Sequence, residues 1–180
     1  MRWLLLPLLL LSASCSAIRY DADWDQAFDF SGLHTWAFLA KEPGPSGDPR
    51  LDNDLFHERT RDAIRRTLQA RGFEGPVATD PQFLVTWQTS VEQRVDVDYV
   101  QRHYGYANYH WGGWTSVDQE VRVRDVGNLL IDVLVPGEKR LVWRGTASAD
   151  LVHSATPEER VARISEAVQG ILANFPPPKE

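Results

Sequence analysis

The chain has 180 residues, of which 43% are hydrophobic and 24% are charged, and its formal net charge is -6. This length suits one globular domain with its own core, and this composition excludes a disordered chain. Because a phosphate-binding surface needs an excess of basic residues, the acidic balance argues against a nucleic-acid partner.

The first fourteen residues predict an export signal. Arg2 supplies a positive charge, Leu4 to Leu11 form an apolar run interrupted by Pro7, and residues 12–14 are small. The run is much shorter than the roughly 20 apolar residues that a transmembrane helix needs. We therefore expect residues 1–14 to be a signal peptide that is removed on export.

Cys15, the only cysteine in the chain, follows these small residues directly. The arrangement resembles the bacterial lipobox, although Ser12 stands where leucine is usual. The resemblance implies a cysteine that carries acyl chains, and two or more such chains give stable membrane anchoring. An ordinary signal peptide with an unmodified Cys15 is the alternative. Ser16, rather than Asp, follows the cysteine, and by resemblance to the Gram-negative sorting pattern this favours the outer membrane.

The first half of the mature chain predicts two strands and a helix. Residues 18–24 alternate between apolar and polar, as a half-buried strand does. Residues 28–39 contain a turn at Ser31-Gly32, followed by a strand with tryptophan and phenylalanine. After a loop rich in proline and glycine, Asp48 is expected to cap a helix whose first residue is Pro49 and which Gly72 ends.

The second half of the chain predicts strands that pair as hairpins. Alternation runs from Phe83 to Tyr99, from Val117 to Val126, from Leu129 to Val135 and from Leu141 to Leu151. In the last two strands the residues expected to face inwards are Leu129, Ile131, Val133, Val135, Leu141, Trp143, Ala147 and Ala149. A capping box at residues 156–159 predicts a final helix that ends before residues 176–178.

These elements predict an α+β fold, with a mainly antiparallel sheet of about six strands and two amphipathic helices packed on one face. We expect residues 15–180 to form a single domain with a folded core over residues 19–178.

Several motifs carry a resemblance over nearly the whole mature chain. They are the lipobox, FDFSGLHTWAF, ARGF at the end of the first helix, PQFLVTW, LLIDVLVPGEKRLVWRGTA and TPEERV. The sequence resembles a family of Gram-negative envelope lipoproteins that carry a domain of unknown function (DUF4136-like). The family implies no catalytic residues, and acylated Cys15 is the only functional residue that it transfers to this chain.

An aromatic loop is the strongest candidate for a binding site in the sequence. Its members lie in one short segment punctuated by glycine: Tyr99, Tyr104, Tyr106, Tyr109, Trp111 and Trp114. Tyrosine and tryptophan offer amphipathic faces to sugar rings, protein partners or the membrane interface. The alternative is that a long hairpin folds these side chains back into a small core of its own.

Catalytic and metal-binding interpretations are weaker. Asp96 and Asp98 share a predicted polar strand face with Glu92 and could exchange protons, but such residues more often solvate an exposed face. His103 and His110, with Asp98 or Asp118, fit no common zinc spacing. Arg122 and Arg124 are expected on a wet face near acidic residues.

The sequence contains no P-loop and no dinucleotide fingerprint, so we expect neither a cofactor nor a bound metal. Taken together, these observations predict a lipoprotein on the periplasmic face of the outer membrane, acting as a non-catalytic binding or structural module. Its expected partners are the membrane, through the lipid anchor, and an envelope protein or glycan. The alternative is a periplasmic hydrolase or metal-dependent enzyme that uses Asp96, Asp98 and the loop histidines.

Overall fold

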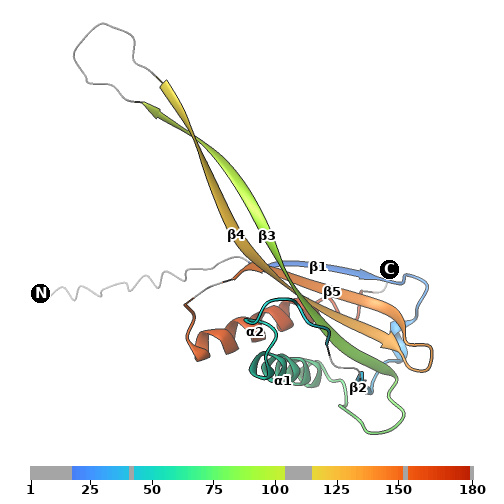
Figure 1. The fold of residues 1–180 in the computed structure, drawn as a ribbon. Coiled ribbons are helices and arrows are strands. Elements are labelled where there is room, and N and C mark those ends of the chain that lie inside the picture. Colours follow the sequence, from blue (N-terminus) through green and yellow to red (C-terminus); the bar gives the residue numbers. More distant parts are fainter. Residues whose placement is uncertain (1–17, 41–42, 104–114, 152–153, 179–180) are drawn as a thin grey trace, which may run out of the picture.

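Five strands form one mixed sheet in the computed structural model, which describes residues 18–40, 43–103, 115–151 and 154–178 (Figure 1). The strands are β1 (Arg19–Trp24), β2 (Trp36–Phe38), β3 (Phe83–His103), β4 (Thr115–Val135) and β5 (Arg140–Asp150). Their order across the sheet is β1-β5-β4-β3-β2, and every pairing is antiparallel except the parallel pairing of β2 with β3. A short 3-10 turn, η1 (Phe30–Gly32), precedes β2, as the Ser31-Gly32 turn predicts.

The sheet has five strands where about six are predicted, because two of the expected strands are one. β4 passes without interruption through Gly127 and Asn128, which stay in register with β3 and β5. The Asn128 side chain donates to Ser90 Oγ at 3.2 Å and accepts from Ser148 Oγ at 2.6 Å. Although Gly127-Asn128 is typical of a turn, Asn128 here joins Ser90 and Ser148 in a hydrogen-bonded row across three strands.

The first helix begins later than expected. Helix α1 spans Asp54–Ala70, and its N-cap is Asn53, whose side chain accepts from the Phe56 amide at 2.9 Å. The expected cap Asp48 lies in a separate turn, where its carboxylate accepts from the Arg50 amide at 2.8 Å. Both residues have the short polar side chain that caps a helix, so the sequence alone does not separate the turn from the helix start.

The second helix confirms its prediction. Helix α2 spans Pro157–Leu172, with Pro157 in the first turn. Thr156 Oγ1 accepts from the Glu159 amide at 3.2 Å, and the Glu159 carboxylate accepts from the Thr156 amide at 2.7 Å. These two bonds satisfy backbone donors that would otherwise have no partner within the helix.

A β-bulge changes the inward face of β5. Between the Val133–Trp143 and Leu134–Leu141 pairs, Val142 is the extra residue, and both Val142 and Trp143 are buried. Leu141, which strict alternation places inwards, is 41% exposed. The bulge places both Val142 and Trp143 on the core side, and Leu141 therefore faces outwards.

Both helices pack on one face of the sheet, as predicted, and cover a core that contains many aromatic rings (Figure 1). Phe175, just after α2, is fully buried, with its ring centroid 5.2 Å from that of Trp143 and 5.4 Å from that of Phe83. Arg71 Nε, at the end of α1, donates to the Phe175 carbonyl at 3.0 Å. This contact joins the C-terminal ends of the two helices over the aromatic part of the core.

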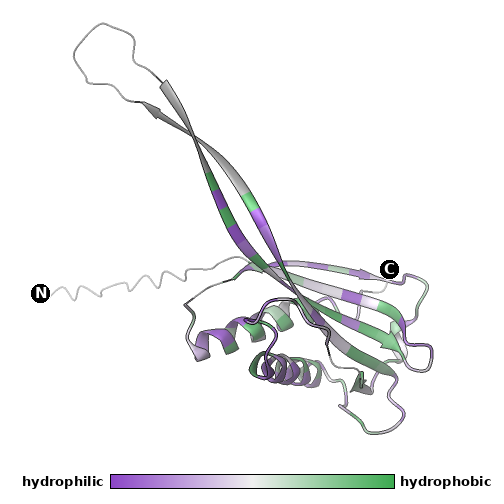
Figure 2. Cartoon of the chain, viewed as in Figure 1, coloured by the Kyte–Doolittle hydropathy of each residue, from purple (hydrophilic) through white to green (hydrophobic). Residues whose placement is uncertain are grey.

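The β3–β4 hairpin extends well beyond the rest of the sheet (Figure 1). From the Gln93–Asp125 pair outwards, the two strands pair only with each other, and we call residues 93–103 and 115–125 the arm. Hydrophobic and hydrophilic bands alternate along its base (Figure 2). Val95, Val121 and Val123 are each 56–58% exposed there. The alternation of apolar and polar residues therefore continues from the body onto the arm, where neither α1 nor α2 covers the apolar side chains.

Candidate functional site

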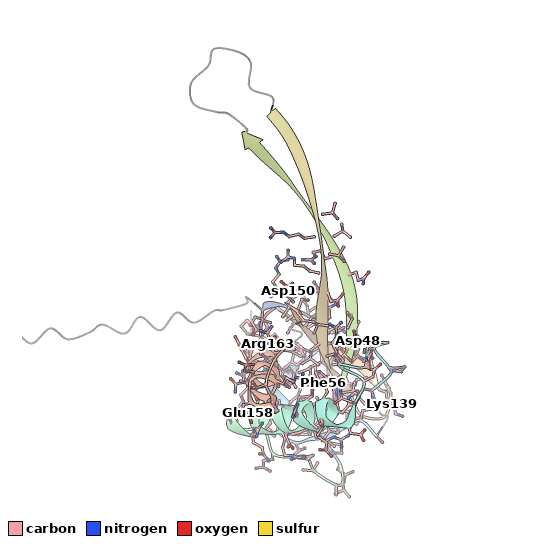
Figure 3. The ribbon with its side chains drawn as sticks, turned by 60° about the vertical axis from the view of Figure 1, so that its left-hand side comes forward. Asp48, Phe56, Lys139, Asp150, Glu158 and Arg163 are labelled. Atoms are coloured by element: carbon pink, nitrogen blue, oxygen red, sulfur yellow. The ribbon has the colours of Figure 1, made fainter. Side chains whose placement is uncertain are left out.

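A cavity of about 650 Å³ lies between the two helices and the sheet, at the end of the body where the arm begins. Figure 3 labels Phe56 of α1, Arg163 of α2 and Asp150 of β5, which contribute to its lining. The sheet side of the cavity consists mainly of Thr89, Gly127, Leu129, Ala147 and Ala149. The volume falls within the range of about 300–1,000 Å³ that is usual for small-molecule sites.

The cavity follows from the order of large and small residues along the sheet. On the helix-facing side, one row of paired strands carries Val85, Val133 and Trp143. Two rows nearer the arm, the corresponding residues are Thr89, Leu129 and Ala147, and the following row carries Val91, Gly127 and Ala149. Small side chains therefore leave space under the helices where the aromatic residues have ended.

The helices run in the same direction, so their N-terminal halves both border the cavity. Residues 53–56 and 59 of the α1 region and residues 160, 163, 164 and 167 of α2 line it, whereas the C-terminal ends meet near Phe175. Leu151 closes one side. An added Cβ on Gly127 would lie 2.6 Å from Leu151 Cδ2, so the glycine allows this leucine to lie against β4.

Four arginines and two aspartates stand among the lining residues, in a chain whose net charge is negative. Two of these arginines are held by neighbours. Arg50 Nη2 lies 2.6 Å from Asp48 Oδ2 and 2.8 Å from Asp125 Oδ2, and these hydrogen bonds raise the pKa of Arg50 above its ordinary value. Arg163 donates to the Asp150 carbonyl at 3.2 Å.

The other two arginines of the lining, Arg59 and Arg160, form no ion pair with any residue in the described ranges. Arg59 comes from the first turns of α1 and Arg160 from the first turn of α2. The two guanidinium groups therefore provide positive charge at the cavity from both helices.

Thr89 lines the sheet side of the cavity, and its hydroxyl is buried within the sheet–helix packing. The residue is 7% exposed, and its Oγ1 is buried without a hydrogen-bond partner among the described residues. A buried hydroxyl without a partner costs free energy, about 1–3 kcal/mol in typical cases.

The aromatic loop lies largely outside the described residues. The structure does not describe residues 104–114, which contain Tyr104, Tyr106, Tyr109, Trp111 and Trp114. Cys15 lies outside the described residues as well. Tyr99 is in β3, paired in register with Gln119, and only its backbone is described. The binding loop and the acylated cysteine therefore stay predictions.

The candidate residues Asp96, Asp98, His103 and Asp118 lie on the arm. Asp96 is paired in register with Arg122, and Asp98 with Glu120. For Asp96, Asp98, His103 and Asp118 only the backbone is described, and His110 is outside the described ranges. The described lining of the cavity includes none of them.

The expected wet face at Arg122 and Arg124 is confirmed. Both side chains are exposed, and Arg124 Nη1 lies 3.1 Å from Asp150 Oδ2. Glu92, one position beyond Val91 on β3, is exposed as well.

Sequence reasoning missed the cavity and its arginines. The available signal was the loss of side-chain volume along the inward positions of β3, β4 and β5, combined with arginine in the first turns of both helices. Alternation of apolar and polar residues predicts which side of a strand faces the core, but it does not predict the side-chain volume on that side.

In the described part of the chain, no group of three or more histidine, cysteine, aspartate or glutamate residues is arranged to hold a metal ion. Neither helix in the described ranges has the length and apolar character needed to cross a membrane.

Comparisons with solved structures give the fold and no activity. The structure is similar to a PDZ domain protein from Parabacteroides distasonis, with a TM-score of 0.55 and 13% sequence identity over 89% of this chain. The aligned part is 36% of that protein, so this chain spans little more than a third of its length. A PelC dodecamer from Paraburkholderia phytofirmans aligns with a TM-score of 0.45 and 9% identity, over 87% of this chain and 96% of that one.

A comparison with curated protein sequences gives no match. The family model described as "Domain of unknown function (DUF4136)" matches residues 20–177, which is nearly the whole described domain. The chain thus belongs to the DUF4136 family, as the motifs in its sequence predict.

Proposed function

We propose that this protein is an outer-membrane lipoprotein, anchored through Cys15 on the periplasmic face, whose domain is a non-catalytic binding module. The observation that carries the binding role is the cavity between α1, α2 and the sheet. A mostly apolar lining with a few polar groups is the usual composition of a small-molecule site.

The anchor is supported by the sequence around Cys15 and tested by its removal. In the producing bacterium, Cys15→Ser is expected to release the protein from the membrane fraction in an unacylated form, because the sulfur that carries the lipid is gone. Mass measurement of the native N-terminus checks the modification directly. Unchanged membrane retention of the Cys15→Ser protein would contradict the anchor.

The cavity is tested with a neutral apolar probe. We expect the full chain with Cys15→Ser, purified without detergent, to bind 1-monolauroyl glycerol in isothermal titration calorimetry. Ala149→Trp places a large ring in the cavity and is expected to abolish binding. Ala70→Trp is the control, because Ala70 is exposed at the end of α1 and outside the lining. Equal binding by both tryptophan variants would remove the cavity as the site.

We propose that the arm is a second binding surface, which contacts an envelope protein or glycan. Its exposed valines, Val95, Val121 and Val123, lead from the body towards the segment that contains the aromatic loop. Exposed apolar residues gathered on one feature are typical of interaction sites. A photo-crosslinking residue at Val123 in intact cells is expected to capture a partner, whereas the same residue at Leu141, at the opposite end of the sheet, is not.

A further inference from the structure

We infer that the cavity takes a single-chain amphiphile with an anionic head group, its tail between the helices and the sheet and its head at Arg59 and Arg160. The inference rests on the proposed binding role of the cavity and adds the chemical class of the ligand. It concerns residues that no sequence motif singled out.

The apolar part of the lining determines the tail. Leu129, Ala147 and Ala149 of the sheet, with Phe56 and Ile164 of the helices, offer only carbon atoms from their side chains. A cavity of about 650 Å³ accommodates one molecule of drug size. This capacity corresponds to one fatty chain with a small head group rather than to a two-chain phospholipid.

The unpaired arginines determine the charge of the head. Arg59 and Arg160 are the two lining arginines for which no ion pair is found in the described part of the chain, and they come from two different helices. Guanidinium groups bind carboxylates and phosphates through charge-assisted hydrogen bonds, which are about twice as strong as neutral ones. A cationic head would meet repulsion from the same two groups.

The position of the cavity gives the ligand a source. Ile18, the first described residue, is part of the lining and lies three residues after Cys15 in the sequence. Three peptide units span at most about 11 Å, so an acylated Cys15 would keep this end of the domain next to the lipid surface. Both free fatty acids and lipid phosphates have the required chemistry.

The test compares probes that share one tail. The full chain with Cys15→Ser is titrated with laurate, dodecyl phosphate, 1-monolauroyl glycerol and dodecyltrimethylammonium, with inorganic phosphate as a head group without a tail. We expect both anionic amphiphiles to bind about tenfold more tightly than the neutral one. A preference for laurate points to fatty acids as the source, and a preference for dodecyl phosphate points to lipid phosphates.

The matched variants separate charge from cavity. The double variant Arg59→Gln with Arg160→Gln is expected to lose the anionic preference while its affinity for 1-monolauroyl glycerol stays unchanged. Arg66→Gln is the control, because Arg66 is exposed on α1, forms no ion pair in the described ranges and is not part of the lining.

Each outcome has a distinct meaning. Equal affinity of wild type for the anionic and neutral probes, or an anionic preference that survives the double variant, overturns the inference and leaves the binding role intact. Inorganic phosphate that binds as tightly as laurate also overturns it, since the tail would then contribute nothing. If none of the tailed probes binds, the proposed function itself fails.

Discussion

At the scale of single residues, a buried carboxylate lies on the face of the sheet opposite the helices. Asp132 of β4 is 5% exposed, and the Arg144 guanidinium of β5 binds it through two hydrogen bonds of 2.7 and 2.8 Å. These bonds raise the pKa of Arg144 above its ordinary value. The sequence places Asp132 among apolar residues, where a carboxylate needs such a partner.

Removing Arg144 is expected to destabilise the protein strongly. Arg144→Ala leaves Asp132 buried without its ion pair, and the free energy of unfolding should fall by about 2–3 kcal/mol. Arg65→Ala breaks the exposed pair between Arg65 and Asp62 and should cost less than about 1 kcal/mol. Urea unfolding of both variants measures the difference. Equal losses would contradict the special role of the buried carboxylate, and Asp132→Asn added to Arg144→Ala should recover part of the stability.

Asp52 gives a prediction that depends on pH. Its carboxylate accepts from the Ser46 amide at 2.7 Å and the Gly47 amide at 2.9 Å, and the hydrogen bond from Ser46 is the largest cause that lowers the pKa of Asp52. Because the folded pKa is lower than the unfolded value of about 3.9, the carboxylate stabilises the fold fully above that value. This contribution is lost as the pH falls through the folded pKa.

The measurement compares wild type with Asp52→Asn in urea between pH 7 and pH 3. At pH 5, where the Asp52 carboxylate is charged, the wild type should be the more stable protein, and its margin over Asp52→Asn should shrink below about pH 4. A margin that widens from pH 5 to pH 3 would show that the amides do not favour the charged form.

At the scale of elements, patterning predicts the kind of each element better than its ends. Both helices, the strand after Ser31-Gly32 and the helix-covered face follow from periodicity and capping residues. The start of α1 does not, because Asp48 and Asn53 are equally good caps and only tertiary contacts of the Asp48 turn distinguish them. The junction at Gly127 does not either, because its extended conformation depends on pairing with strands on both sides.

The cavity escaped prediction for a related reason. Each strand, considered alone, is apolar on its inward face, and nothing within one strand shows which rows the helices cover. The empty volume exists only because the small residues of three strands lie side by side. Such neighbours are far apart in the sequence, and their register depends on the Val142 bulge and on the long hairpin.

The arm is predicted to be dispensable for folding. Replacing residues 94–124 by Asn-Gly would join Gln93 and Asp125, which already pair, through a two-residue hairpin turn. Since Val95, Val121 and Val123 are more than half exposed, little burial is lost, and the free energy of unfolding should change by less than about 1 kcal/mol. Chemical denaturation checks this, with 1-monolauroyl glycerol binding as a second readout.

A variant that fails to fold, or that folds but loses the cavity ligand, would contradict the separation of the arm from the body. Asp125 is kept in the design because its contact with Arg50 ties the base of the arm to the segment before α1.

At the scale of the whole molecule, the domain combines three features along one axis. The aromatic core lies at one end of the body and the cavity at the other. The arm projects from the body at the cavity end (Figure 1). Ile18, the first described residue, lines the cavity as well. The proposed anchor, ligand and partner would thus all act at one end of the body, while the aromatic end provides its stability.

This arrangement predicts that ligand binding and global stability are linked. A ligand that fills the cavity contacts both helices and three strands, so it binds the folded state and not the unfolded chain. At a laurate concentration of 100 times its dissociation constant, the free energy of unfolding of the Cys15→Ser chain should rise by about 2.7 kcal/mol. Denaturant titration with and without laurate measures the increment, and Ala149→Trp should abolish it while Ala70→Trp preserves it. An increment that survives in the Ala149→Trp protein would mean that laurate stabilises the domain from another surface, because the ring leaves no room for the tail beside β5.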